Sequence, residues 1–137
     1  MAPGNHVASS APLDPAARVI EPFAPRQLWR IDQALSAADR ETGLTFSVYV
    51  GDLDEPTRQA AELLHKHLGE RADSAILIAV SPNQRVVEIV TGAYARRRLP
   101  DRLCALAVLS MTAAFEVGDL AGGVVTGLRM LADQGRS

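Results

Sequence analysis

Arginines that lie close together in the chain are the strongest indication of a ligand site in this sequence. Four of them surround one acidic residue, Asp101, between a predicted strand and a predicted helix, and they are Arg96, Arg97, Arg98 and Arg102. Guanidinium groups match the oxygens of phosphate and carboxylate, and the free N–H groups of a helix N-terminus add further donors. The cluster is therefore the best candidate in the chain for a site that binds a small anionic ligand, and the preferred interpretation is a solvated basic loop.

Two carboxylates that follow a predicted strand, Asp52 and Asp54, could act as a nucleophile and a general acid or base. Their spacing is similar to the nucleophile motif of aspartyl-phosphate phosphatases, which places Thr or Val two residues after the second aspartate. Here Thr57 comes one position later, behind Pro56, and the lysine and acidic pair that this reaction also needs have no evident counterpart. The preferred interpretation is a loop whose acidic residues favour the N-terminus of the next helix.

The histidines and the one cysteine favour structural roles. His65 and His67 are two residues apart on a predicted helix, so their side chains point to nearly opposite sides and cannot share a metal ion. We expect both of them to be partly exposed, and His6 lies in the N-terminal tail. Cys104 is the single cysteine of the sequence, so a disulfide framework is excluded. On an apolar helix it is expected to be a small core residue.

A run of glycines near the C-terminus is unusual for a helix, because each interior glycine costs about 1 kcal/mol relative to alanine. The run extends from Gly118 through Gly122 to Gly127. The preferred interpretation is close packing on the sheet or on the preceding helix, and the alternative is that Asp119 and bare backbone line a pocket. Glu88, inside a predicted strand, is expected to pair with an arginine or else to belong to a site.

Composition limits the kinds of protein this chain can be. It has 137 residues, of which 47% are hydrophobic and 22% are charged, as in one soluble globular domain. The formal net charge of -2 argues against a general nucleic-acid binder, since neutralising phosphates needs a basic surplus. No apolar stretch approaches the ~20 residues that span a bilayer, so no membrane span is predicted.

Hydrophobic periodicity predicts four main helices and three strands. The helices are expected over residues 25–42, 56–68, 101–117 and from 119 onward, and the strands over residues 44–50, 75–80 and 85–91. The apolar run 75–80 predicts a central strand that is buried on both faces. A strand, a helix and a strand imply a right-handed parallel crossover, and the turn at 81–84 adds an antiparallel hairpin. The fold class is therefore a single α/β/α sandwich with a small mixed sheet.

Two helices have patterns that predict how they are buried. In the helix over residues 101–117, Asp101 is expected to be the N-cap, and leucines such as Leu106 and Leu109 make the helix apolar on most sides. A helix that is apolar on most sides is expected to be largely buried. In the helix over residues 56–68, Leu63 and Leu64 are expected to face the core. The segment 93–100 is predicted to be a basic loop.

The N-terminal segment is expected to lie outside the folded domain, which we assign to residues 25–134. Prolines and small residues predict a flexible tail over residues 1–17 and an extended arm over 18–24, where Val19, Ile20 and Phe23 dock. The segment lacks a basic start and a continuous apolar stretch, so no signal peptide is predicted. The expected location is the cytoplasm.

The order of four segments resembles the TPM domain. These segments are Ala75–Val80, Arg85–Gly92, Leu99–Asp101 and the glycine run that begins at Phe115. The TPM family includes thylakoid-lumen acid phosphatase-like proteins and photosystem repair factors. A finer pattern, Ser47–Leu53 with Glu88–Gly92 and Gly127–Ala132, is similar to a family of small uncharacterised proteins from high-GC bacteria that is related to TPM domains. The resemblance covers roughly residues 25–134.

The resemblance implies an α/β/α sandwich with a cleft near the ends of the central strands. Acid phosphatase activity and calcium binding have been attributed to some TPM domains. By position the cleft would involve Thr91, Gly92, Asp101 and Asp119, and the residues Glu88 and Gly122 complete our set of cleft candidates. The glycine-rich loop that usually precedes the Ala75–Val80 strand is short here and keeps only Gly69.

Three hypotheses about function follow. The preferred one is a cytosolic, TPM-like, non-catalytic binding or assembly module. The second is a weak acid phosphatase or an anion- or calcium-binding protein, in which Arg96, Arg97 and Arg98 recognise the anion and Asp101 or Asp119 is the acid/base or the calcium ligand. The third is a homodimer formed through an exposed strand or helix face. No cofactor is evident apart from the calcium that the resemblance implies, and no nucleic-acid partner is expected.

Overall fold

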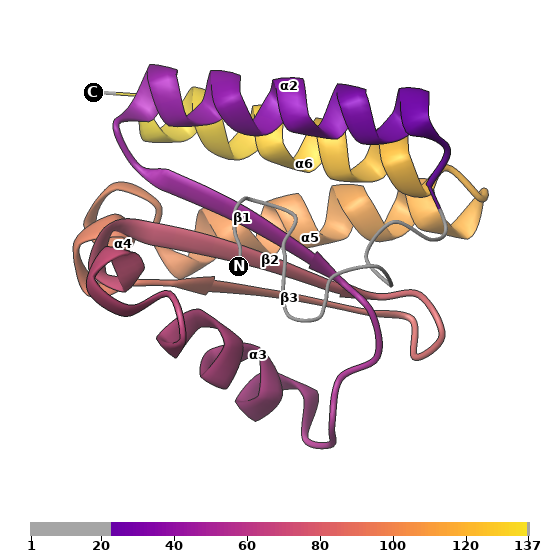
Figure 1. Ribbon diagram of the computed structural model, residues 1–137, viewed down its shortest axis with the longest axis horizontal. Helices are drawn as coiled ribbons and strands as arrows, with labels where there is room; N and C mark the ends of the chain where they lie inside the picture. The colour runs from indigo at the N-terminus through magenta and orange to yellow at the C-terminus, as the bar shows by residue number, and fades with distance from the viewer. Residues whose placement is uncertain (1–22, 137) are drawn as a thin grey trace.

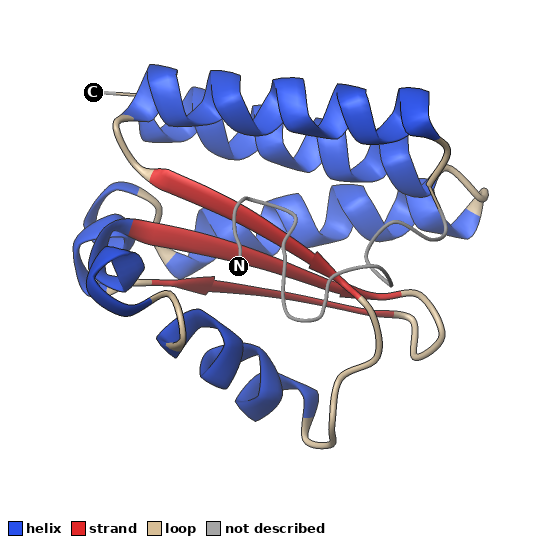
Figure 2. Ribbon diagram, in the orientation of Figure 1, coloured by secondary structure: helices blue, strands red, loops and turns tan. Residues whose placement is uncertain are grey.

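The chain folds into a three-stranded sheet with helices on both faces, as Figures 1 and 2 show. This computed structural model describes residues 23–136. Helices α2, α5 and α6 cover one face of the sheet and helix α3 covers the other. The expected α/β sandwich with a mixed sheet is therefore confirmed. Residues 1–22, which include Val19, Ile20 and His6, lie outside the described part of the chain, whereas Phe23 is buried as expected.

The sheet has the order β1-β2-β3, and its strands are β1 (Thr45–Val50), β2 (Ala75–Ser81) and β3 (Val86–Thr91). Strands β1 and β2 are parallel, with Thr45 opposite Ala75. Strands β2 and β3 are antiparallel, with Ser81 opposite Val86. Every residue of β2 is buried, because both of its faces carry helices. The predicted crossover, hairpin and central strand are all confirmed.

The helices form two layers of unequal size. The larger layer contains α2 (Pro25–Thr42), α5 (Asp101–Glu116) and α6 (Leu120–Gly135), and the smaller layer is α3 (Thr57–Lys66). Helix α6 lies between α2 and α5, with α2 next to β1 and α5 next to β3. The main core lies under these three helices, and a smaller core lies under α3. Within residues 23–136, no helix combines the length and hydropathy that crossing a membrane requires.

Local signals in the sequence set the ends of α2. Pro25 fits the first turn, where a backbone N–H would have no partner in any case. Gly43 ends the helix with a φ of 75°, a left-handed conformation that glycine adopts without strain. The Asp39 carboxylate then accepts a hydrogen bond from the Phe46 N–H at 2.8 Å. This bond fixes the direction in which β1 leaves the helix.

The segment predicted to be a basic loop is instead a helix, α4 (Ala93–Arg98). Alanine and arginine are good helix formers, and Leu99, which is fully buried, anchors the end of this helix to the core. A 3₁₀ helix, η1 (Gly69–Ser74), packs against the point where α4 begins. There a Cβ on Gly92 would lie only 1.9 Å from the carbonyl oxygen of Ala72, so this approach requires glycine.

Helix α5 is less buried than its sequence predicts. Its buried residues are Cys104, Ala107 and Met111, whereas Leu106 and Leu109 are 51% and 68% exposed. The physical reason is position: α5 lies over β3, which is one of the two edge strands, and packs on α6 at one side only. Its N-cap is Pro100 rather than the expected Asp101, which is the first residue of the helix.

The glycines of α6 let it approach α5 closely. A Cβ on Gly123 would lie 2.5 Å from Cε1 of Phe115, and one on Gly127 would lie 2.5 Å from Sδ of Met111. The packing interpretation of the glycine run is thus confirmed. Asp119 is the N-cap of α6 as expected, and its carboxylate accepts a hydrogen bond from the Gly122 N–H at 3.0 Å.

Candidate functional site

The acidic residues expected to share a cleft lie at opposite ends of the domain. Asp101 begins α5 and Asp119 comes three residues after its last residue, Glu116, so the 16 residues of the helix separate them by about 24 Å. Arg98, at the end of α4, donates a hydrogen bond to the Gly135 carbonyl at the last residue of α6. Helix α4 therefore lies at the end of α6 that is far from Asp119.

The other cleft candidates also lie at opposite ends of the domain. Thr91 and Gly92 are buried directly before α4, and so belong to the end of the domain that holds Asp101. Gly122 belongs with Asp119, whose Oδ2 atom would lie 2.1 Å from a Cβ at that position. The structure thus does not bring the predicted set together into one cleft.

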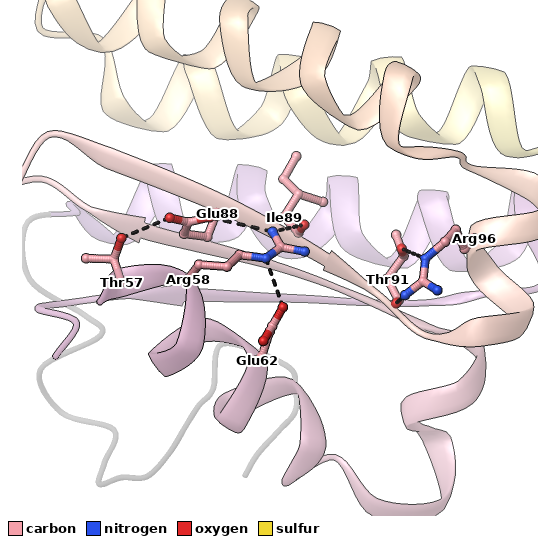
Figure 3. Close-up of polar contacts among 7 residues, drawn as sticks. All are labelled: Thr57, Arg58, Glu62, Glu88, Ile89, Thr91 and Arg96. Carbon is pink, nitrogen blue, oxygen red and sulfur yellow. Dashed lines mark hydrogen bonds and ion pairs between the residues drawn. The ribbon is translucent and has the colours of Figure 1, made fainter. Parts of the chain in front are cut away.

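Glu88 takes part in a network that joins β3 to α3, shown in Figure 3. Its Oε2 atom accepts a hydrogen bond from Thr57 Oγ1 at 2.9 Å, and its Oε1 atom lies 3.5 Å from Arg58 Nη1. Arg58 also donates to the Ile89 carbonyl at 2.8 Å and to Glu62 at 3.1 Å. The expected pairing of Glu88 with an arginine is confirmed, and Arg58 is the partner that the sequence did not identify.

The four clustered arginines are divided among different contacts. Arg96 donates to the Thr91 carbonyl at 2.8 Å, as Figure 3 shows, and Arg98 donates to the Gly135 carbonyl. The Arg97 guanidinium lies 6.0 Å from the centre of the Tyr94 ring. Arg102 is exposed on α5. Two of the four guanidinium groups thus bond backbone carbonyls, a third lies near a ring of its own helix, and the four make no common contact.

The acidic loop after β1 is held by the turn between β2 and β3. Asp52 accepts a hydrogen bond from the Asn83 side chain at 3.1 Å. The Gln84 side-chain amide accepts a hydrogen bond from the Leu53 N–H and donates one to the Leu53 carbonyl, each at 2.8 Å. Helix α3 begins at Thr57 without a side-chain cap and without an acidic residue in its first turn. The loop is structural as expected, but its acids do not cap the helix.

The two histidines differ in environment. His65 is only 9% exposed, and its Nε2 atom lies 3.1 Å from the Ala75 carbonyl oxygen. Burial lowers the pKa of His65 below its ordinary value of 6.5. His67 is exposed at the end of α3, where its Nδ1 atom lies 2.7 Å from the Leu63 carbonyl. The expectation of two partly exposed histidines is wrong for His65, because a backbone carbonyl satisfies its buried ring.

Cys104 is a buried thiol, as expected. Burial, followed by the nearby charge of Asp101, raises the pKa of Cys104 to about 11, so the thiol stays protonated at neutral pH. In the described part of the chain, no group of three His, Cys, Asp or Glu side chains is placed to hold a metal ion.

A groove lies between α2 and α6. Its volume is about 480 Å³. Small apolar residues of both helices contribute to its lining, and they are Ala34, Ala37, Ala38, Val125 and Ala132. The remaining lining residues are Trp29, Gln33, Arg30, Arg40, Arg129, Arg136, Glu41 and Asp133. We call this site the α2–α6 groove.

The α2–α6 groove carries more positive than negative charge. Arg136 lies 3.6 Å from Glu41 and 3.2 Å from Asp133, which accounts for both acidic residues of the lining. Within residues 23–136, the exposed side chains of Arg30, Arg40 and Arg129 make no ion pair. Trp29 is 63% exposed and also lines the groove. Its four arginines outnumber its two acidic residues, and three of the guanidinium groups make no ion pair with the described residues. One accessible aromatic ring lines the same groove.

The sequence contained a pattern for each of the two helices that line this groove, but no sign that these helices pack against each other. Residues 30, 33, 34, 37 and 41 recur at helical spacing, as do residues 125, 129, 132, 133 and 136. Only the packing of α6 against α2 shows that the two stripes face each other.

Comparison with known proteins places the chain among bacterial relatives. A family described as a domain of unknown function, DUF5130, matches residues 6–132. Uncharacterized proteins MT2543 and Rv2468c of Mycobacterium tuberculosis, strains CDC 1551 and H37Rv, are each 37% identical to it over 112 residues. These alignments cover 81% of this chain and 66% of each relative, so the chain spans just under two thirds of their length.

Solved structures share the fold at low sequence identity. The N-terminal domain of a protein from P. gingivalis has a TM-score of 0.72 at 21% identity, covering 82% of this chain and 75% of that chain. The N-terminal domain of the cg2496 protein from Corynebacterium glutamicum has a TM-score of 0.69 at 14% identity, covering 82% and 73%. The BA42 protein from Bizionia argentinensis has a TM-score of 0.74 at 16% identity, covering 84% and 82%.

Proposed function

This chain belongs to the DUF5130 family, and we propose that its domain is a non-catalytic binding module whose α2–α6 groove takes an anionic ligand. The observation that carries the proposal is the group of three arginines, Arg30, Arg40 and Arg129, that line the groove without an ion pair in the described structure. Guanidinium groups bind phosphate and carboxylate oxygens through paired hydrogen bonds, so these three arginines favour an anionic ligand.

The shape of the groove limits the size of that anion. About 480 Å³ lies within the range of small-molecule sites, which is roughly 300–1,000 Å³. Alanines in the lining keep the space between the helices open, because their side chains end at Cβ. Trp29 adds an aromatic ring against which a flat apolar group can stack. The ligand class that fits best is a phosphate or carboxylate attached to a planar group.

The non-catalytic character is supported by how the candidate acids are placed. Asp101 and Asp119 are about 24 Å apart, Glu88 is held by Thr57 and Arg58, and the pKa of Cys104 is raised to about 11. Kinship with TPM domains and a cytoplasmic location remain part of the proposal. The support for the kinship is the order of segments from β2 to α6. The alternatives, a weak acid phosphatase or a calcium-binding protein, would need acidic side chains that lie close together in one site.

The first experiment uses Trp29, the single tryptophan of the chain, as a reporter. Titration with phenyl phosphate should change the intrinsic fluorescence saturably, and benzoate should do the same. Inorganic phosphate should bind more weakly because it lacks the ring. A ligand that binds only the folded state also raises the melting temperature. No saturable change with any of these three anions would contradict the proposal.

Variants then test the groove itself. The double substitution Arg30→Gln with Arg129→Gln should weaken phenyl phosphate binding at least about tenfold, which corresponds to 1.4 kcal/mol. Arg26→Gln is the matched control, because Arg26 is an exposed arginine of α2 outside the groove. Equal weakening by both variants would indicate a diffuse charge effect. Turnover of an aryl phosphate that Asp119→Ala abolishes would favour the phosphatase alternative instead.

A further inference from the structure

The outer face of α5 is an exposed stripe without a partner among the described residues. Its members are all exposed, and they are Arg102, Ala105, Leu106, Leu109, Ala113 and Glu116. We call them the α5 stripe. Leu106 is 51% exposed and Leu109 is 68% exposed, and beyond the stripe Val117 is 81% exposed. A stripe of this kind on a helix normally packs against another element.

The α5 stripe is nearly symmetric about Leu109. Arg102 precedes Leu109 by seven residues and Glu116 follows it by seven, so all three lie on one face of the helix. Ala105 and Ala113 lie four residues before and after Leu109. The stripe therefore has an apolar centre, two small residues beside it, and opposite charges at equal distances from the centre.

We propose that α5 is a homodimer interface, in which the α5 stripes of two copies pack antiparallel about a two-fold axis near Leu109. In this arrangement Leu109 meets its own copy, and the alanines allow the two helices to approach closely. Arg102 of each copy then lies opposite Glu116 of the other, so one symmetric contact forms two ion pairs. An interface that uses the same patch on both copies must be self-complementary in this way.

The opposite charges at the two ends of the α5 stripe are the reason to expect a second copy of this chain as the partner. Within one copy, Arg102 and Glu116 are fourteen residues apart, which is about 21 Å along the helix, and they cannot neutralise each other. Reversing the helix direction places each charge against its opposite. One helix face is smaller than the about 800 Å² per partner of a standard interface, so the dimer should depend on protein concentration.

The proposed dimer is independent of the α2–α6 groove. Helix α6 lies between α2 and α5, so the groove and the α5 stripe belong to separate parts of the helical layer. Loss of dimerisation therefore leaves anion binding intact, and loss of anion binding leaves dimerisation intact.

The first test is sedimentation velocity of the full 137-residue chain over a concentration series. The chain should shift from monomer to dimer as concentration rises, and Leu109→Glu should remain monomeric at every concentration because two like charges meet at the axis. Leu63→Glu is the matched control and should dimerise like the wild type. Leu63 was expected to face the core, but it is a 58% exposed leucine on α3. A wild-type chain that is monomeric throughout, or a dimer that Leu109→Glu leaves unchanged, overturns the proposal.

The second test is a charge exchange, which a merely destabilising substitution cannot imitate. Arg102→Glu alone and Glu116→Arg alone should each weaken the dimer, because each places like charges opposite one another. The double variant Arg102→Glu with Glu116→Arg should restore dimerisation, since it reverses both ends of the stripe. Failure of the double variant to recover association overturns the antiparallel pairing.

A third test locates the axis directly. Leu109→Cys should be crosslinked between copies by a short bismaleimide, because the two thiols would lie next to each other. The native Cys104 is only 6% exposed and so leaves the new thiol as the accessible one. Leu63→Cys should give no crosslinked dimer under the same conditions. Equal crosslinking of the two variants overturns the assignment of the axis to Leu109.

Discussion

Arg58 Nη1 lies 3.5 Å from Glu88 Oε1, and the same guanidinium nitrogen donates a hydrogen bond to the Ile89 carbonyl at 2.8 Å. One side chain of α3 thus satisfies both a side chain and a backbone group of β3, as Figure 3 shows. Strand β3 is one of the two edge strands of the sheet, and these contacts hold α3 over it. The Glu88 side chain is only 20% exposed, so its charge needs this partner.

Arg58→Ala should destabilise the domain by about 1–3 kcal/mol, because it leaves Glu88 and the Ile89 carbonyl without a charged donor. The free energy of unfolding from urea denaturation measures the change. Glu62→Gln should change it by less than about 0.5 kcal/mol, since the Arg58–Glu62 pair is exposed. Equal effects of the two variants would show that the contacts to β3 add no stability.

Gly92→Ala should destabilise the domain more than Gly127→Ala. At Gly92 the added Cβ meets backbone, 1.9 Å from the Ala72 oxygen and 2.4 Å from the Asp73 oxygen, and backbone cannot move without displacing η1. We expect a cost of about 3 kcal/mol or more. At Gly127 the Cβ meets only the flexible Met111 side chain, and the alanine adds up to about 1 kcal/mol of helix propensity. Thermal unfolding of both variants tests this order.

Asp39 should make the domain less stable as pH rises. Burial raises the pKa of Asp39 from 3.8 to about 6, although the Phe46 N–H and the Arg71 charge lower it. Between these two pH values the folded state binds the proton more tightly than the unfolded chain, so this contribution to stability falls from about pH 4 to pH 6. Asp39→Asn keeps an oxygen for the Phe46 N–H and should remove that fall.

The measurement for Asp39 is urea denaturation at several pH values. The Asn variant should exceed the wild type in stability at pH 7 and should lose this advantage at pH 4. Parallel curves for the two proteins across that range would show that Asp39 does not titrate with a raised pKa.

The titration of His65 should have the opposite effect to that of Asp39, because it makes the domain less stable as pH falls. Burial lowers the pKa of His65 below its ordinary value of 6.5, so the unfolded chain binds the proton more tightly. The stability that comes from the neutral, buried ring is present above pH 6.5 and is lost as pH falls below it. His65→Gln keeps a side-chain N–H that can reach the Ala75 carbonyl and should lose less stability between pH 7 and pH 5. Chemical denaturation at both pH values provides the comparison.

Features that depend on residues close together in the chain could be predicted from the sequence. Pro25 and Gly43 bound α2, and Asp119 caps α6, because a helix end depends on backbone groups within a few positions. The apolar run in β2 and the turn that follows it predicted a central strand and a hairpin, and both are present. The pairing of Glu88 with an arginine was predicted as a type of contact, without the identity of Arg58.

Features that depend on which elements become neighbours were predicted less well. The basic segment before Leu99 is the helix α4, because a buried anchor and good helix formers outweigh its charge. Helix α5 is apolar on most sides, yet it lies over the edge strand β3 and so keeps an exposed face. His65 is buried because Ala75, ten residues away in the chain, brings a carbonyl to its ring.

The amino-acid sequence by itself determined the four main helices, the strands and the mixed sheet, since these follow from local periodicity and turn residues. Only the tertiary structure decided where chemistry can occur. It separated Asp101 from Asp119 by the length of α5, and it placed Arg30 of α2 in the same groove as Arg129 of α6. The physical reason is that a site consists of side chains brought together by packing, and packing joins residues whose distance along the chain carries no signal.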